Sequence, residues 1–199
     1  YRNVEKLEGY AEDEPLGGKD PYSASKVGTE AVVAAWQQIA KVSGGPSVIS
    51  VRAGNVIGGG DWNENRIIVD CITSWNNNQS VEVRSPNSTR PWQHVLEPLS
   101  GYLTVGQYLY EDKVQNGEAF NFGPKAELTK TVLELTKDLA IYWGLDIDKT
   151  IRITDSIPFE EAKLLRLNCD KALSYLNWHS TLSYEQCVKL IADWYGAFY

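Results

Sequence analysis

The clearest pattern of apolar and polar positions lies after Asp20. Apolar residues recur every three or four positions between Val27 and Ile39, a spacing typical of one face of an α-helix. Asp20 is a suitable N-cap residue, and Pro21 fits the first helical position. The pattern therefore predicts a helix that begins at Pro21 and ends near Gly44.

A run of β-branched residues follows this helix and predicts a buried strand over residues 47–53. The strand leads into a glycine-rich segment, residues 54–62, which we expect to be a loop. Open parallel sheets bind ligands at the carboxyl ends of their strands. This loop is therefore a candidate binding element.

Shorter patterns predict the remaining elements. We expect helices over residues 66–75, 99–110 and 128–143, and a last helix that starts at a capping box of Ser183 and Gln186 and runs towards Phe198. We expect short strands over residues 81–84, 91–95, 119–123 and 150–154. The alternation of strands and helices indicates an α/β fold with a small carboxyl-terminal lobe.

Composition excludes some classes of protein. The chain has 199 residues, of which 43% are hydrophobic, and a formal net charge of −7; nucleic acids and anionic membranes instead require a basic surface. No apolar run approaches the roughly 18 residues of a membrane span and no leader pattern is visible, so we expect a cytoplasmic location. Cys71, Cys169 and Cys187 lack any paired spacing, which favours buried thiols over a metal site or a disulfide framework.

Tyr22 and Lys26 are the strongest candidates for chemistry. They lie four residues apart at the start of the predicted helix, so their side chains share one face. A nearby ammonium favours the ionised form of a phenol, and a phenolate is a general base for a substrate hydroxyl. The alternative is that the two residues are simply neighbours on a helix surface.

The sequence around these two residues resembles a known family. Tyr22-Ser-Ala-Ser-Lys26 is similar to the active-site signature of the extended short-chain dehydrogenase/reductases, the NAD-dependent epimerase/dehydratase family. Residues 52–62 and 87–98 resemble, more narrowly, the sugar-nucleotide 4,6-dehydratases that act on CDP-glucose. The resemblance implies the carboxyl-terminal part of a Rossmann-type parallel sheet plus a small mixed α/β substrate-binding lobe.

The resemblance also implies a division of the chain. Residues 1–60 would be the remainder of an NAD-binding domain, and residues 61–199 mainly the substrate-binding lobe, with about 95–123 returning to the NAD-binding domain. The family's glycine-rich dinucleotide turn precedes the Tyr-x-x-x-Lys signature, and no such turn precedes Tyr22 here. We therefore expect the chain to be the carboxyl-terminal portion of a longer enzyme and to be inactive alone.

The implied activity is conversion of CDP-glucose to CDP-4-keto-6-deoxyglucose by internal hydride shuttling through NAD. Tyr22 would take the proton of the glucose 4-hydroxyl, and Lys26 would hold the nicotinamide ribose. Two alternatives stay open: a related sugar-nucleotide epimerase, and a catalytically inert fragment. The family also implies a homodimer that packs through the helix at residues 21–42.

The remaining site residues follow from the resemblance. The expected cofactor-binding residues are Tyr22, Lys26, Arg52 and Asn55. The expected substrate-binding residues are Asn55, Arg66, Ile67, Arg84, Arg90 and Asn121. His94 is expected to be a hydrogen-bonded core residue, and no metal is expected. The family's usual His-Glu-Ala reads Glu160-Glu161-Ala162 here, so this stretch is not assigned nucleobase contacts.

Overall fold

The computed structural model describes residues 1–124, 129–154 and 164–199. The helices are α1 (Pro21–Ser43), α2 (Ile67–Asn76), α3 (Leu96–Tyr110), α4 (Val132–Tyr142), α5 (Ile147–Thr150), α6 (Asp170–Leu176) and α7 (Tyr184–Phe198). The strands are β1 (Ser50–Ala53), β2 (Val56–Ile57), β3 (Val81–Val83), β4 (Thr89–Arg90), β5 (Gln93–His94), β6 (Ala119–Phe122), β7 (Lys130–Thr131) and β8 (Ile151–Ile153). Leu128 and the Glu160-Glu161-Ala162 stretch lie outside the described residues.

The strands pair across long stretches of sequence. β1 pairs with β6, β2 with β5 and β3 with β8, all in parallel, whereas β4 and β7 are antiparallel. In the β1–β6 pair, Ser50 lies opposite Ala119 and Arg52 opposite Asn121. Parallel pairs need a crossover connection, usually one that contains a helix, and the predicted α/β class is confirmed.

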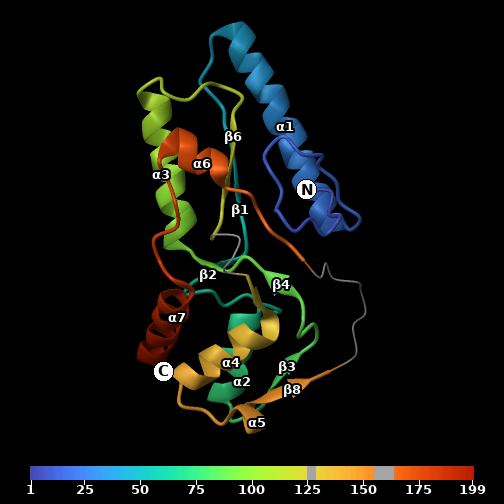
Figure 1. The fold of residues 1–199 in the computed structure, drawn as a ribbon, viewed down its shortest axis with the longest axis vertical. Helices are drawn as coiled ribbons and strands as arrows, with labels where there is room; N and C mark the ends of the chain where they lie inside the picture. Colours follow the sequence, from blue (N-terminus) through green and yellow to red (C-terminus); the bar gives the residue numbers. More distant parts are fainter. Residues whose placement is uncertain (125–128, 155–163) are drawn as a thin grey trace.

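Two hydrophobic clusters lie at opposite ends of an elongated molecule (Figure 1). The smaller cluster is built around Phe120 and Phe122 of β6, against which α3 and α6 pack. The larger one lies between α2, α4, α7 and β3, with Ile72, Leu139 and Tyr195 fully buried within it. β2 and β5 pair between these two regions.

Glu97 joins the two regions. This carboxylate, on α3, is 3% exposed. Its Oε1 accepts hydrogen bonds from the backbone N–H groups of Thr181 and Leu182 and from the Thr181 hydroxyl. A buried carboxylate is stable only when it is hydrogen-bonded. Glu97 therefore holds the segment that leads into α7 against α3.

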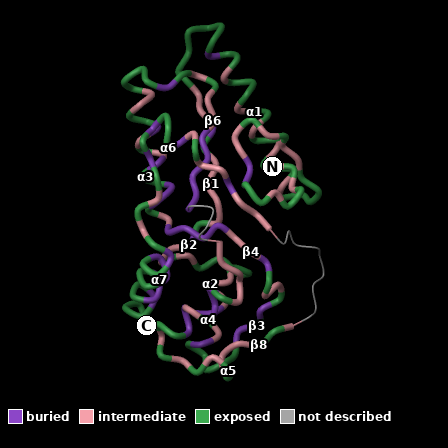
Figure 2. Tube along the Cα trace, in the orientation of Figure 1, coloured by how far each residue is buried: buried purple, intermediate pink, exposed green. Residues whose placement is uncertain are grey.

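Helix α1 has the predicted bounds but not the burial that its apolar residues suggested. Asp20 accepts hydrogen bonds from the backbone of Tyr22 and Ser23, and Gly44 ends the helix in the left-handed conformation at φ +70, which glycine adopts without strain. Nevertheless Ala40 is the one buried residue of α1. Figure 2 shows the helix mostly in the colour of exposed residues, with some positions in the colour of intermediate ones.

The strand expected over residues 47–53 is shorter and less buried than predicted. β1 begins at Ser50, and Val51 is 37% exposed. The β-branched run was interpreted as a strand covered on both faces, but the described chain covers one face of it incompletely. Burial on both faces depends on neighbouring elements, which a local run of residues does not specify.

Other differences concern short elements. β2 lies within the expected loop at residues 54–62, β7 within the helix expected over residues 128–143, and α5 and α6 were not predicted. Two-residue strands carry no alternating pattern that could reveal them.

Helix α3 starts at Leu96 rather than residue 99, because Pro98 is tolerated in a first helical turn. The capping box of Ser183 and Gln186 is confirmed.

Candidate functional site

Tyr22 and Lys26 lie in the first two turns of α1. The Asp20 carboxylate accepts from the backbone N–H of Tyr22 and so fixes the start of the helix beside it. The Tyr22 side chain is 68% exposed, and the Lys26 ammonium lies 5.4 Å from the centroid of its ring. The structure therefore brings this pair together on an accessible face.

Arg52 forms an ion pair with Glu30 of α1. Its Nε donates to Glu30 Oε1 and its Nη2 to Oε2, both at 2.9 Å, and the Ser50 hydroxyl donates to Oε1 at 2.7 Å. The hydrogen bonds from Arg52 hold the pKa of Glu30 below its ordinary value. Burial opposes the charge of Arg52, but the hydrogen bonds and charge interactions with Glu30 and Tyr1 together outweigh it, so the pKa of Arg52 is raised.

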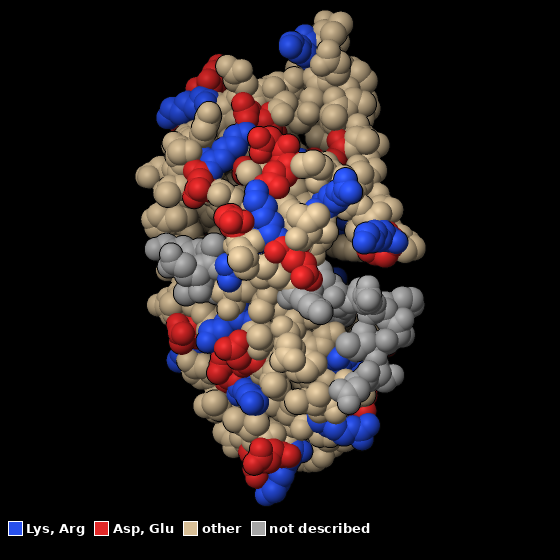
Figure 3. Space-filling view, turned by 45° about the vertical axis from the view of Figure 1, so that its right-hand side comes forward, with Lys and Arg blue, Asp and Glu red and all other residues tan. Residues whose placement is uncertain are grey.

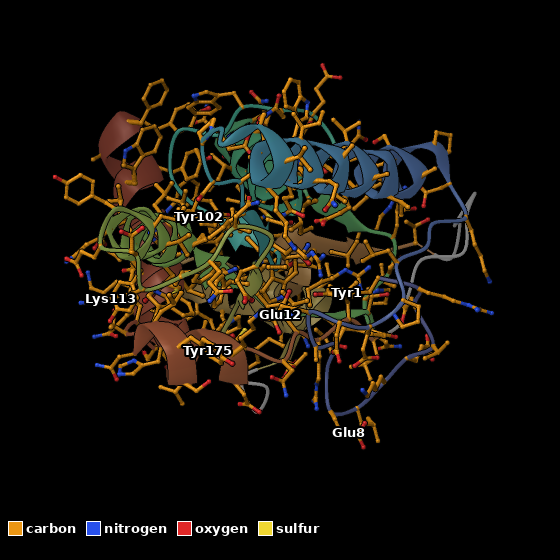
Figure 4. All side chains as sticks on the ribbon, turned by 90° about the horizontal axis from the view of Figure 1, so that it is seen from above. Tyr1, Glu8, Glu12, Tyr102, Lys113 and Tyr175 are labelled. Carbon is orange, nitrogen blue, oxygen red and sulfur yellow. The ribbon has the colours of Figure 1, made fainter. Side chains whose placement is uncertain are left out.

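Asn121 is fully buried in a second polar network. Its amide donates to the carbonyls of Tyr10 and Asn168, and its Oδ1 accepts from the Tyr1 hydroxyl. Its backbone N–H donates to a carboxylate oxygen of Glu12. In the view of Figure 4, Tyr1 lies beside Glu12, and Lys113 lies at the opposite edge from Tyr1. Contact between Asn121 and a sugar nucleotide would require one of these bonds to break.

Asn55 follows β1 by two residues, and its backbone is tied to the neighbouring strands. Its carbonyl accepts from the backbone N–H of Gln93, while Gly54 N–H and the Gln93 side-chain amide both donate to the carbonyl of Phe122. The loop at the carboxyl end of β1 is therefore fixed by β5 and β6. Asn55 itself is partly exposed.

Arg66, Ile67 and Arg84 gather at the start of α2. Arg66 occupies the N-cap position and is exposed, whereas Ile67 packs against the larger hydrophobic cluster. Arg84 follows β3, and its Nη2 lies 3.4 Å from Oδ1 of Asn65. An N-terminal helical turn with two exposed guanidinium groups beside it is suited to a phosphate.

Arg90 and His94 lie on short strands between the two hydrophobic clusters. Arg90 is half-buried on β4, and its Nη1 donates to the carbonyl of Thr89. His94 is buried on β5, and its Nδ1 accepts from the backbone N–H of Leu96. The interpretation of His94 as a hydrogen-bonded core residue is confirmed.

The structure thus connects some predicted site residues more directly than others. Arg52 lies opposite Asn121 and is joined through Glu30 to the helix of Tyr22 and Lys26. Glu30 was not among the predicted site residues, although the sequence contains a pattern that points to it. Ser50 and Arg52 are two residues apart on a strand and thus share one face, and an acidic residue on the preceding helix is a natural partner for both.

A groove of about 340 Å³ separates α1 from the strand pair. It is lined by residues from α1, β1 and the start of β6, among them Val27, Glu30, Ala34, Ser50 and Ala119. A second cavity, of about 550 Å³, lies among α4 and α7 near Trp143 and Tyr199. Neither cavity is lined by Tyr22.

Charges of both signs are interspersed over the face drawn in Figure 3, with no broad basic region on that face. Within the described ranges, no helix has the length and hydropathy that crossing a bilayer requires. Over the same residues, no group of three or more His, Cys, Asp or Glu side chains is arranged to hold a metal ion.

The ion pair of Glu30 predicts a pH dependence of stability. Because the pKa of Glu30 is depressed in the folded state, its contribution is fully present above its ordinary value of 4.5 and is lost as the pH falls through the folded-state value. Urea unfolding of the wild type and Glu30→Gln, measured between about pH 7 and about pH 3, should show a stability gap that narrows on acidification. A gap that stays constant would contradict this prediction.

The fold agrees with comparisons to known proteins. Residues 1–123 match the NAD dependent epimerase/dehydratase family, and the chain belongs to this family. It is 43% identical to the CDP-glucose 4,6-dehydratase of Salmonella typhimurium, in an alignment that covers 99% of this chain and 56% of that protein. The chain therefore spans little more than half the length of this relative.

Solved structures show the same fold. DesIV, a dTDP-glucose 4,6-dehydratase from Streptomyces venezuelae solved with NAD bound, superposes with a TM-score of 0.80 at 21% identity, over 95% of this chain and 55% of that one. UDP-glucuronic acid 4-epimerase from Bacillus cereus gives a TM-score of 0.80 at 19% identity, over 96% of this chain and 57% of that one. The Rossmann-type fold is thereby confirmed, and it is common to dehydratases and epimerases.

Proposed function

We propose that the protein carrying this chain is an NAD-dependent sugar-nucleotide 4,6-dehydratase that converts CDP-glucose to CDP-4-keto-6-deoxyglucose. The observation that carries the proposal is the 43% identity to a CDP-glucose 4,6-dehydratase along 99% of the chain. The exposed Tyr22 phenol with the Lys26 ammonium beside it supplies the chemistry that the first step needs.

In this proposal Tyr22 is the general base. Its phenolate accepts the proton of the glucose 4-hydroxyl as C4 becomes a ketone. Lys26 would donate hydrogen bonds to the hydroxyls of the nicotinamide ribose. The exposed hydroxyl and ammonium on one helix face fit a ribose diol. When bound, NAD would take up a hydride from C4 and give it back at C6, so the overall reaction consumes no oxidant.

The other residues divide between cofactor and substrate. Asn55, at the carboxyl end of β1, contacts the cofactor and the sugar nucleotide. Arg52 is proposed to contact the cofactor. Arg66, Arg84 and Arg90 bind the pyrophosphate, because guanidinium groups pair with phosphate oxygens through two donors at once. Two further substrate contacts, Ile67 and Asn121, are proposed from the family resemblance.

The architecture and surroundings of the enzyme are also part of the proposal. Residues 1–60 and about 95–123 belong to the NAD-binding domain, and the rest of 61–199 mainly to the substrate-binding lobe. The exposed apolar residues of α1, among them Val32, Trp36 and Ile39, favour packing of this helix against its copy in a homodimer. A nucleotide-sugar substrate favours a cytoplasmic location.

The test is an assay of the complete gene product with CDP-glucose and NAD. The expected product is a 4-keto sugar nucleotide that has lost one water, identified by mass spectrometry and by proton NMR of a new C6 methyl group. Conversion to an isomer of unchanged mass would indicate an epimerase and overturn the proposal. UDP-glucose and dTDP-glucose serve as parallel substrates, and faster turnover of either would overturn the assignment to CDP-glucose.

A further inference from the structure

Glu30 is the polar contact that joins α1 to β1. The Arg52 guanidinium contacts both of its carboxylate oxygens, and Ser50 contacts one of them. The Arg52 side chain is 16% exposed and the Glu30 side chain is 22% exposed. Paired, planar hydrogen bonds of this kind fix direction as well as distance. Glu30 therefore holds the helix in one orientation over the strand.

Among the described residues, apolar packing covers little of α1. Ala40 is buried, but Trp36 is 58% exposed and Val42 is 81% exposed. The groove of about 340 Å³ leaves part of the inner face of the helix open. A second polar attachment, from the Asn116 amide to the carbonyl of Gln37, lies two turns further from the signature residues. Glu30 is thus the attachment nearer to Tyr22 and Lys26.

Arg52 is itself held on its other side. Its Nη1 donates to the Tyr1 hydroxyl at 2.8 Å and to the carbonyl of Glu12 at 2.9 Å, and the Tyr1 ring lies 5.2 Å from the guanidinium carbon. The guanidinium is therefore a fixed anchor on the strand and does not move freely with the helix.

The position of Glu30 on the helix of Tyr22 and Lys26 indicates how much a small rotation of α1 would displace these two side chains and lower the reaction rate. Glu30 lies four residues after Lys26 and eight after Tyr22, which is about 12 Å along the axis for the longer spacing. A rotation of about 10° moves an atom 5–6 Å from the helix axis by about 1 Å. A misplacement of about 1 Å can cost about 100-fold in rate.

We propose that Glu30 is a positioning residue for Tyr22 and Lys26: together with Arg52 and Ser50 it sets the rotation of α1 relative to β1. This inference rests on the proposed function, because it assigns Glu30 a part in the same reaction. Glu30 acts through the helix and does not touch the sugar.

The first test uses Glu30→Gln in the complete gene product, with CDP-glucose and NAD. The expected result is a fall in kcat of about 10- to 100-fold, with KM for CDP-glucose and the Kd for NAD changed by less than about threefold. Arg52→Lys, which keeps the charge but removes the planar fork, should also lower kcat, and its Kd for NAD is measured in parallel because Arg52 is itself a proposed cofactor contact. Glu82→Gln is the matched control, since Glu82 forms an exposed ion pair with Arg152 in the other half of the molecule, and its kcat should equal that of the wild type.

The double variant Glu30→Gln/Tyr22→Phe separates positioning from a general loss of structure. If Glu30 acts in part through Tyr22, its substitution should lower the residual rate of Tyr22→Phe by a smaller factor than it lowers the wild-type rate. Fully multiplicative losses would overturn the inference.

A readout without substrate keeps this test separate from that of the proposed function. Fluorine NMR of 3-fluorotyrosine at position 22 should show a shifted or broadened resonance in Glu30→Gln and an unchanged one in Glu82→Gln. Identical spectra in Glu30→Gln and the wild type would overturn the inference. A wild type that does not convert CDP-glucose would instead overturn the proposed function and leave this spectral test to decide the role of Glu30.

Discussion

Replacing Tyr22 with phenylalanine is expected to lower the rate of 4-keto product formation by about 10²- to 10⁴-fold, the usual range for loss of a general base. The substitution removes one oxygen atom from a side chain that is 68% exposed. Its effect on the free energy of unfolding should therefore stay within about 0.5 kcal/mol. Product formation by the complete gene product, followed under saturating CDP-glucose and NAD, measures the change.

A matched control for this substitution exists on α3. Tyr110 is 91% exposed, and Tyr110→Phe makes the same chemical change at a position outside the proposed site. We expect it to retain the wild-type kcat. If Tyr22→Phe also retained kcat, Tyr22 would have no part in proton transfer.

The second large effect concerns stability and involves Phe122. This side chain is fully buried at the end of β6, with its ring 4.8 Å from that of Trp178 and 5.6 Å from that of Tyr102, between centroids. A Cβ at Gly101 would lie 2.3 Å from the Phe122 ring, so the ring packs directly against the backbone of α3. Phe122→Ala should lower the free energy of unfolding by about 3–5 kcal/mol, because it removes buried apolar area and leaves a cavity.

Leu103→Ala is the control for Phe122→Ala. Leu103 lies on α3 and is 77% exposed, so its truncation should change the free energy of unfolding by less than about 0.5 kcal/mol. Urea unfolding of both variants, with the slope compared to the wild type, measures the difference. A loss below about 1 kcal/mol for Phe122→Ala would show that the smaller cluster does not stabilise this half of the molecule as described.

Much of the fold was predictable where local chemistry decides it. Asp20, Pro21 and Gly44 specify both ends of α1 through capping and backbone preference, which act within a few residues. The same holds for the capping box of Ser183. The short strands β2, β4, β5 and β7 form because distant segments meet, so β2, β4 and β7 were not foreseen and β5 was expected to be longer.

The candidate site divides in the same way. The spacing of Tyr22 and Lys26 requires that they share a helix face, and the structure places the ammonium beside the ring. No local pattern shows that Arg52 contacts Glu30 rather than remaining available to a ligand, because their partnership depends on how α1 lies across β1. The network around Asn121 likewise combines residues from both ends of the chain.

The sequence by itself therefore determined the helix that carries Tyr22 and Lys26, the alternation of strands and helices, and the family. These features depend on residue spacing and on hydrogen bonds between near neighbours. Only the tertiary structure decided which strands pair, how little of α1 is buried and which charged groups hold it to the sheet. Those outcomes depend on contacts between residues far apart in the chain, whose free energies no local pattern encodes.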